Sequence, residues 1–417
     1  MTSLLGPALG VCDYRRWWVA TLATWMALQM IDVAIGWQIY AQHHSTLYLG
    51  LVGLLEFVPM FVLALPAGHL ADRVERRLLF AFALVLGAAI GAGLCLLSTL
   101  EVRSLAPYLL LALAIGVASA LLTPSSWAMV PNLVPVSLLP SAVTLSTVSS
   151  RAASVLGPAL GGALFAASPV AAYGTAGGIC LGGALSVLTI KRAPAAVEHA
   201  SQNVRDVLEG LHFVLDSPIL LGAMLLDLLG VLFGGALALL PVFASSILHV
   251  GPTGLGFLRA SPAVGALLGA TILTRRPLNG RLGRTLLVVV AAFGASILVF
   301  GVSRAFPLSL IALGVSGFVD VFSMNIRSLL STYATPDRLR GRVSAVEMVF
   351  ISASNELGAF ESGVAAALIG TVPAVLAGGV LTIALALGWR WTFPALARID
   401  RPTDIPGNWV ADATPSA

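Results

Sequence analysis

Long apolar runs alternate with short polar breaks along almost the whole chain. Reading each run from one charged or Pro- and Gly-containing break to the next gives twelve segments, which start near residues 18, 47, 78, 107, 139, 169, 218, 252, 285, 307, 342 and 372. A helix needs about 20 apolar residues to cross a bilayer, and the spacing of these starts leaves room for that. The pattern predicts an all-α membrane protein with twelve transmembrane helices.

The composition supports a membrane protein and excludes a large soluble domain. Hydrophobic residues make up 58% of the chain, charged residues 10%, and the mean hydropathy is +0.95, far from the averages of soluble proteins. The three cysteines, Cys12, Cys95 and Cys180, lie far apart, so neither a disulfide framework nor a metal cluster is indicated. The net charge of +4 does not indicate nucleic-acid binding, because the basic residues fall at the ends of the segments.

The basic residues also predict the orientation in the membrane. Of the 23 Lys and Arg residues, only Arg103 and Arg304 fall on the outer side if the N-terminus is cytoplasmic, while Arg151, Arg259 and Arg327 lie within spans. All others fall on the cytoplasmic side, as the positive-inside rule requires. We therefore expect both termini in the cytoplasm.

The longest connection, residues 191–217, divides the chain into two sets of six spans. We expect an N-terminal half at residues 1–190, a C-terminal half at 218–395 and a disordered tail at 396–417. Within the connection, Asn203 and Asp206 favour a helix start, and one apolar stripe follows, made of Val204, Val207, Leu208, Leu211 and Leu215. This predicts an amphipathic helix on the cytoplasmic surface, where a tether is favoured over a regulatory role.

The two halves resemble each other in three places that occur in the same order. The stretch "GLLEFVP" at 53–59 matches "GFLRASP" at 256–262, Asp32 and Asp227 occupy similar places, and "PVSLLPSAV" and "PDRLRGRVSAV" each lead into the fifth span of their half. Two parallel six-helix pseudo-repeats explain this order, with the substrate path expected between them near the middle of the membrane.

Charged residues inside the spans are the main candidates for function. A charge at the bilayer centre costs about 2.5–3.5 kcal/mol on insertion scales, so such residues are expected to face protein or water. The acids are Asp32, Glu56, Asp227, Asp320, Glu347, Glu356 and Glu361, and the bases are Arg151, Arg259 and Arg327. Because three arginines cannot neutralise seven acids, some carboxylates are expected to be protonated, exposed to water or paired with a cationic substrate.

Structural and functional roles compete at each of these positions. Arg327 and Asp320 share a helix face, which favours a structural role, and Glu347 is expected near the headgroups. The candidates for proton or substrate coupling are Asp32, Glu56, Arg151, Asp227, Arg259, Asp320, Glu356 and Glu361, with Asp32 and Glu356 favoured. Whether Asp32 pairs with Arg151 stays open at this stage.

Small residues in the fifth span predict close helix packing. The motif "GPALGG" contributes Gly157, Pro158, Gly161 and Gly162, which permit close approach and local bending. Ordinary small-residue packing is the simpler interpretation, and it also suits helices that rock against each other.

The stretch "GHLADRVERR" resembles the signature between spans two and three of the major facilitator superfamily. The resemblance implies a conformational latch made of Gly68, Asp72, Arg73, Arg76 and Arg77, in which Asp72 contacts the cytoplasmic start of span eleven. Glu75 stands where the commonest form of the signature has glycine, and the corresponding stretch "TRRPLNGRLGR" between spans eight and nine lacks the aspartate.

Further stretches narrow this resemblance to one branch of the superfamily. "GPALGG" resembles the span-five motif of its exporters, and "TPDRLRGRVSAV" and "SNELGAFESG" are similar to the branch that contains the enterobactin exporter and related drug and macrolide efflux proteins. The resemblance implies a multi-pass protein of the bacterial inner membrane that exports small molecules in exchange for protons. Enterobactin itself is not implied, because fold does not fix function.

The leading hypothesis is therefore a proton-coupled exporter of amphipathic, siderophore- or drug-like molecules, working by alternating access. Uptake or facilitated diffusion of a polar solute is the main alternative, and a membrane-embedded transferase or a nontransporting sensor are further ones. No enzyme, cofactor or metal is expected: the six histidines lie in loops or at span ends, and a phosphate-binding glycine loop is missing. The expected partners are small molecules, protons and lipid, and a monomer is expected.

Overall fold

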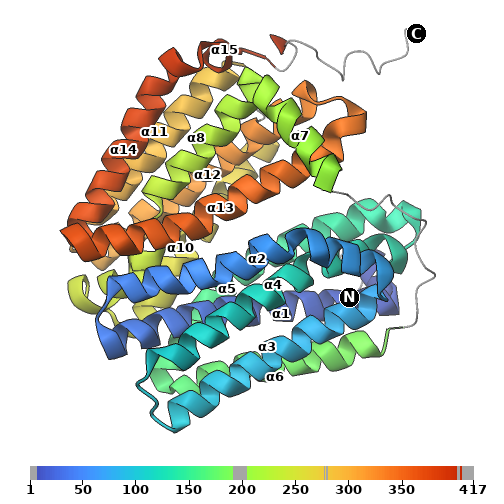
Figure 1. Cartoon of the computed structure of the whole chain (residues 1–417), viewed down its shortest axis with the longest axis vertical. Coiled ribbons are helices and arrows are strands. Elements are labelled where there is room, and N and C mark those ends of the chain that lie inside the picture. The colour runs from blue at the N-terminus through green and yellow to red at the C-terminus, as the bar shows by residue number, and fades with distance from the viewer. Residues whose placement is uncertain (1–6, 191–203, 277, 279, 402–403, 406–417) are drawn as a thin grey trace. The chain divides into compact units, whose positions relative to one another are not determined.

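The computed structural model describes residues 7–190, 204–276, 278, 280–401 and 404–405. Among the residues it describes, every regular element is helical. The long helices of the first half are α1 (Cys12–His43), α2 (Thr46–Arg73), α3 (Arg76–Thr99), α4 (Leu105–Leu133), α5 (Leu139–Ala167) and α6 (Pro169–Leu188). The all-α prediction and the arrangement of twelve long spans are confirmed (Figure 1).

The second half follows the same order after a shorter helix, α7 (Val204–Asp216). Its long helices are α8 (Pro218–Gly234), α10 (Gly251–Arg275), α11 (Leu282–Val302), α12 (Phe306–Ala334), α13 (Asp337–Ile369) and α14 (Thr371–Thr392), and a short α15 (Pro394–Ala397) follows. The first helix, α1, starts six residues before the position that the apolar pattern predicts, α13 starts five residues before it, and the other long helices start within three residues of it.

The chain folds into two compact units whose boundaries do not coincide with the two halves of the sequence. Unit 1 contains Met1–His44, Leu51–Ser201 and Phe243–Ala260, and unit 2 contains Ser45–Gly50, Gln202–Val242 and Ser261–Ala417. The first turn of α2 thus packs within unit 2, and the first part of α10 packs within unit 1. Each unit borrows one helix end from the other half of the sequence.

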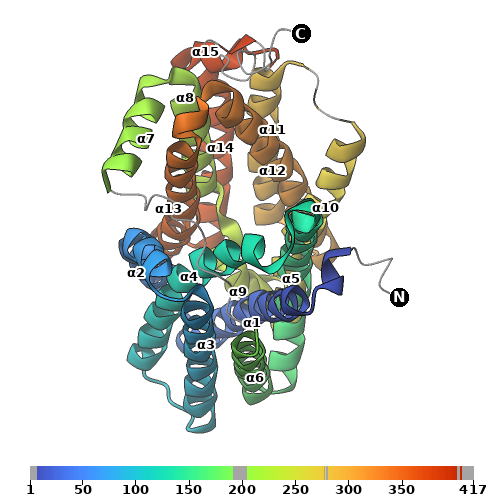
Figure 2. The same ribbon diagram turned by 90° about the vertical axis from the view of Figure 1, so that its right-hand side faces the viewer.

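Unit 1 is built around α1, which packs against both α5 and α6, while α3 packs against α4 and α6 (Figure 2). Its core includes the fully buried side chains of Tyr14 and Trp17. The Tyr14 hydroxyl donates a hydrogen bond to the Ala142 carbonyl at 2.8 Å. This bond gives the buried phenol the partner that it needs in an apolar environment.

Unit 2 repeats this arrangement with α8, α11, α12, α13 and α14. Helix α11 packs between α12 and α14, and α8 packs against α13 and α14 (Figure 1). The Trp389 indole of α14 donates a hydrogen bond to the Gly222 carbonyl of α8 at 2.9 Å. The bond satisfies a buried indole N–H and fixes α14 against α8.

The seventh span is interrupted, which the apolar pattern did not predict. Its apolar stretch runs over 30 residues, Pro218–Ile247, but α8 ends at Gly234 and is followed by η3 (Ala236–Leu239), α9 (Leu240–Val242) and the π-helical η4 (Phe243–Ile247). Glycines favour a break here, and Pro241 lacks the N–H needed to continue an α-helix. The Ser362 hydroxyl of α13 donates to the Gly235 carbonyl at 2.9 Å, so the interrupted backbone is hydrogen-bonded by a neighbouring helix.

Two of the twelve long helices stand out by their polarity. Among the described residues, ten candidate spans are long and apolar enough to cross a membrane. Helices α5 and α13, which occupy the fifth position of each half, do not qualify. Their side chains are too polar for lipid contact all round, so one face of each helix must meet protein or water.

The predicted amphipathic helix forms as α7 and packs on unit 2, but its buried face differs from the predicted stripe. Val214 is fully buried, and Val207 and Leu211 pack against the same core, whereas Leu208 and Leu215 are exposed. The helix lies against α13 (Figure 1). Its prediction as a helix on the membrane surface did not account for this packing.

The close fit of α7 on α13 depends on one glycine and one ion pair. A side chain at Gly210 would collide with the backbone of Arg342, and the Arg342 guanidinium forms an ion pair with Glu209. The tail that the sequence predicts from residue 396 is packed in its described part: Ile399 and Ile405 are buried, and the Gly283 amide donates to the Ile399 carbonyl at 2.9 Å.

We expect that reversing either charge of the Glu209–Arg342 pair lowers the thermal stability of the purified protein and that reversing both restores it. Glu209→Lys and Arg342→Glu each replace attraction by repulsion, and a partly exposed pair contributes about 0.2–1 kcal/mol. A double-mutant cycle by thermal unfolding measures this coupling. The control is Arg338→Glu, a charge reversal at an exposed site of the same helix. Additive effects of the two reversals would contradict the assigned pairing.

Candidate functional site

The intramembrane charges divide unequally between the two units. Within unit 1, Asp32, Glu56, Arg151 and Arg259 give two acids and two bases. Within unit 2, Arg327 is the arginine in the interior of the spans, and the acids are Asp227, Asp320, Glu347, Glu356 and Glu361. The negative charge is therefore balanced in unit 1 and in excess in unit 2.

Asp32 of α1 forms an ion pair with Arg259 of α10 in unit 1. Both side chains are partly buried, at 29% and 26% exposure. In this conformation Asp32 pairs with Arg259 and not with Arg151. The guanidinium comes from the second half of the sequence, from the part of α10 that packs within unit 1.

Asp227 of α8 forms the second ion pair, with Arg327 of α12 at 2.6 Å, and both side chains are only 7% exposed. The sequence favoured a structural role for Arg327 beside Asp320 on its own helix. Two turns of α-helix separate those positions by about 10 Å, so the arginine instead pairs with the neighbouring helix. Removing one partner of such a buried pair is costly, because the remaining charge stays desolvated.

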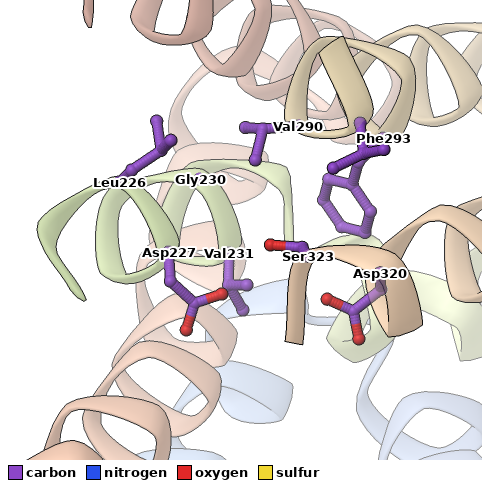
Figure 3. A pocket seen from close by; sticks show the side chains of 9 residues that line it. Leu226, Asp227, Gly230, Val231, Val290, Phe293, Asp320 and Ser323 are labelled. Atoms are coloured by element: carbon purple, nitrogen blue, oxygen red, sulfur yellow. The ribbon is translucent and has the colours of Figure 1, made fainter. Parts of the chain in front are cut away.

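A small cavity lies beside this pair. It is lined by Asp227 and Gly230 of α8, by Asp320 and Ser323 of α12, and by apolar side chains that include Phe293 of α11 (Figure 3). Its volume of about 20 Å³ is enough for a water molecule. The cavity therefore joins a buried ion pair to a second carboxylate through a space that water can enter.

Glu356 and Glu361 of α13 are half-buried, as is Glu56 of α2. The Glu361 side chain interacts with Ser362, the residue whose hydroxyl binds the interrupted backbone at Gly235. Gly358 lies on the same helix, and a side chain there would touch the backbone of Leu232. Glu361 is thus placed next to the break in the seventh span.

Helix α5 has two polar faces with different surroundings. On one face Ser149 accepts a hydrogen bond from the Trp18 indole at 2.6 Å, and Ser146 lies near the Tyr14 hydroxyl. On the opposite face, Thr144 and Thr147 are exposed, and Arg151 is half-buried. Arg151 has no hydrogen bond or ion pair with any residue whose side chain the structure describes.

The motif "GPALGG" brings three helices together in unit 1. Added side chains at Gly157 and Gly161 would collide with Gln29 and Met30 of α1. A side chain at Gly162 would collide with the Pro252 carbonyl and would lie 3.0 Å from the Gly256 Cα of α10. Glycine is therefore required for contact at these points.

Pro158 takes part in the same contact, since a side chain at Gly256 would meet its carbonyl. A similar contact occurs in unit 2, where a side chain at Gly363 of α13 would lie 2.7 Å from the Gly50 Cα of α2. These are the two helix ends that each unit borrows from the other half of the sequence, and glycines hold both in place.

The structure describes the side chains of only two of the latch residues, Arg76 and Arg77. The backbone of α2 continues through Gly68, Asp72 and Arg73, but their side chains lie outside the described residues. The signature is therefore mostly helix, and only Val74 and Glu75 connect α2 to α3. Arg77 pairs with Glu75 at 3.0 Å and donates to the Ile190 carbonyl after α6, so it binds within unit 1. Arg76 is half-buried at the start of α3.

Sequence reasoning missed the hydroxyl groups that organise the site. Ser323 lines the cavity, Ser362 binds the interrupted backbone, and Tyr40 of α1 binds Ser246 of η4 at 3.1 Å. Their only signal was the presence of hydroxyl residues in apolar spans, which is too common to single out a position.

Residues 6–411 match the family model MFS_3, described as transmembrane secretion effector. The chain belongs to this family. One curated relative is the enterobactin exporter EntS of Citrobacter koseri, which is 28% identical over 396 residues covering 94% of each chain. EntS of Escherichia coli O1:K1 / APEC is 29% identical over 366 residues, or 87% of this chain and 86% of that one.

Solved transporter structures share the fold. The nucleoside transporter NupG superposes with a TM-score of 0.68 at 16% identity, and the match covers 93% of this chain and 99% of that one. The predicted major facilitator resemblance is thus confirmed, and the chain is a multi-pass membrane transporter of this superfamily.

We expect Gly162→Ala to destabilise the protein and Gly178→Ala to be tolerated. The methyl group at position 162 would overlap the α10 backbone, whereas nothing lies within 4 Å of a side chain added at Gly178. Overpacking of this kind costs about 1–3 kcal/mol. Thermal unfolding of both purified variants checks the difference, and equal stability of the two would contradict the assigned contact.

Proposed function

We propose that this transporter exports amphipathic, siderophore- or drug-like molecules in exchange for protons, by alternating access. The observation that carries the proposal is the excess of acidic residues inside the spans of unit 2. Among residues that the structure describes, the spans of unit 2 contain five carboxylates and one arginine, which pairs with Asp227. Burial in a low-dielectric interior disfavours the charged form of a carboxylate, so a set of acids at this depth is suited to binding protons.

The cavity beside Asp227 gives the proton a place to enter. Asp320 and Asp227 both line it, and it has space for water. A proton that binds to Asp227 removes its charge and weakens its attraction for Arg327, and loss of that proton restores the attraction. Such a pair has two states, and a transporter needs two-state elements to couple ion movement to helix movement.

Asp32 and Glu356 are the residues that we favour for coupling to the substrate. Asp32 pairs with Arg259 across α1 and α10, so its protonation would release a contact between segments from different halves of the sequence. Glu356 is half-buried in α13, one of the two helices that are too polar for lipid. We assign the other glutamate candidates, Glu56 and Glu361, a supporting role in proton binding.

Export is favoured over uptake because the relatives named enterobactin exporter cover most of the chain. Uptake of a polar solute by the same fold is the second candidate, because a fold by itself does not fix the direction of transport. We place the protein in the bacterial inner membrane with both termini in the cytoplasm, on the distribution of its basic residues. We also propose Asp72 as the latch carboxylate.

Transport by purified protein in liposomes under an imposed pH gradient tests the function. The panel contains siderophores, macrolides and cationic dyes, and lumenal pH is recorded at the same time. We expect substrate movement coupled to opposite proton flux, and empty liposomes serve as control. Substrate movement without proton flux would contradict antiport, and accumulation with proton flux in the same direction would indicate uptake.

We expect Asp32→Asn and Asp227→Asn to abolish proton-driven transport while substrate exchange at equal pH continues. Each change removes a titratable carboxylate and keeps the shape of the side chain. Because Asp227→Asn leaves Arg327 desolvated and alone, the double variant Asp227→Asn/Arg327→Gln controls for lost stability. Gradient-driven efflux at the wild-type rate in Asp32→Asn or in the double variant would show that coupling does not depend on that residue.

A further inference from the structure

Arg151 occupies an unusual position among the arginines inside the spans. Arg259 is paired with Asp32 and Arg327 with Asp227. Arg151 is half-buried in the middle of α5 and makes no hydrogen bond or ion pair with the part of the chain whose side chains are described. A guanidinium cannot give up its proton in a protein, so this charge calls for water or an anion.

The face of α5 that carries Arg151 is suited to a polar ligand. Thr144, Thr147 and Arg151 follow one another at helical spacing, and the same face continues to Pro158 and Gly162. The last two contact the start of α10 within unit 1. The arginine therefore lies on the same face of α5 as the residues that contact the start of α10.

The hydroxyl groups on and beside this face of α5 all donate hydrogen bonds to backbone carbonyls of the same helix. Thr144 donates to the Pro140 carbonyl at 2.9 Å, and Thr147 donates to the Val143 carbonyl at 3.0 Å. Ser150 and Ser154 likewise donate within α5, at 2.9 Å and 3.0 Å. Each hydroxyl oxygen keeps lone pairs, so the face presents acceptors, and Arg151 supplies the donors beside them.

The polarity of the whole helix is an independent observation. Helix α5 is one of the two long helices that are not apolar enough to qualify as a span. Its other polar residues, Ser146 and Ser149, are turned toward α1. The face with Arg151 therefore carries the polar residues that α1 does not cover, and the exposed apolar side chains of Val143 and Val148 lie on either side of it.

We propose that Arg151 binds an anionic group of the transported molecule, so that the substrate is an amphipathic anion. The threonine oxygens accept hydrogen bonds from donors next to that group, and the flanking apolar side chains contact its hydrocarbon or aromatic part. The guanidinium offers a two-pronged geometry that matches a carboxylate or sulfonate. This inference rests on the proposed transport function and specifies its substrate class.

Ligand-induced stabilisation of the purified protein tests the proposal without any proton gradient. The probes are two matched pairs: 2-naphthoate with 2-naphthamide, and naphthalene-2-sulfonate with naphthalene-2-sulfonamide. We expect wild-type protein to bind at least one anion about tenfold more tightly than its uncharged partner, the size of a charged hydrogen-bonded contact. In Arg151→Gln this preference disappears, while affinity for the uncharged partner changes less than about twofold.

Two further variants separate recognition from stability. Arg151→Lys keeps the positive charge but loses the two parallel N–H donors of the guanidinium. We therefore expect it to retain part of the preference for the anion over the uncharged partner. Arg304→Gln removes an exposed arginine outside the spans and leaves the preference intact. Equal weakening of anion and uncharged partner in Arg151→Gln, or no preference for either anion in wild-type protein, would overturn the proposal. Proton coupling is measured separately, in liposomes. If substrate moves there without proton flux but wild-type protein still prefers the anion, the proposed proton exchange fails and the proposed anion binding stands.

Discussion

A charge that leaves water for the interior of a membrane protein needs a compensating charge, a proton or a polar ligand, and this constraint organises the whole molecule. In unit 1 it is met by the Asp32–Arg259 pair, which draws a helix end from the second half of the sequence toward α1. In unit 2 it is met in part by the Asp227–Arg327 pair, which joins α8 to α12. We assign proton binding to carboxylates of unit 2 and binding of the substrate's anionic group to Arg151 of unit 1.

The charges can act only because the backbone allows helices to approach closely and to bend. Gly162 and Gly256 let α5 meet α10, and Gly50 and Gly363 let α2 meet α13. The seventh span breaks after Gly234, and a hydroxyl from α13 binds the interrupted chain. In each case the absence of a side chain, or of regular helix, occurs beside an intramembrane charge. Close helix packing and the intramembrane charges therefore occur on the same helices.

The polar helices α5 and α13 show how the two halves differ within one architecture. Both occupy the fifth place of their half, and both are too polar to face lipid on all sides. Helix α5 carries hydroxyls and an arginine, whereas α13 carries glutamates near the broken span. The roles that we propose follow this chemistry: donors for an anion in unit 1, and proton-binding carboxylates in unit 2. The two halves share one helical arrangement, and the functional roles that we propose rest on the residues that differ between α5 and α13.

The sequence by itself determined the number and positions of the spans, because the apolar length needed to cross a bilayer leaves a one-dimensional signal. It also identified the intramembrane charges and the glycine motif, since such residues are costly or rare among apolar runs. Only the tertiary structure decided the pairing. Arg327 lies on the same helix as Asp320 but binds Asp227, and Asp32 binds Arg259 rather than Arg151. The buried face of α7 and the break after Gly234 were likewise settled by packing. Pairing and packing depend on which helices become neighbours, and that is a long-range property that helical periodicity does not contain.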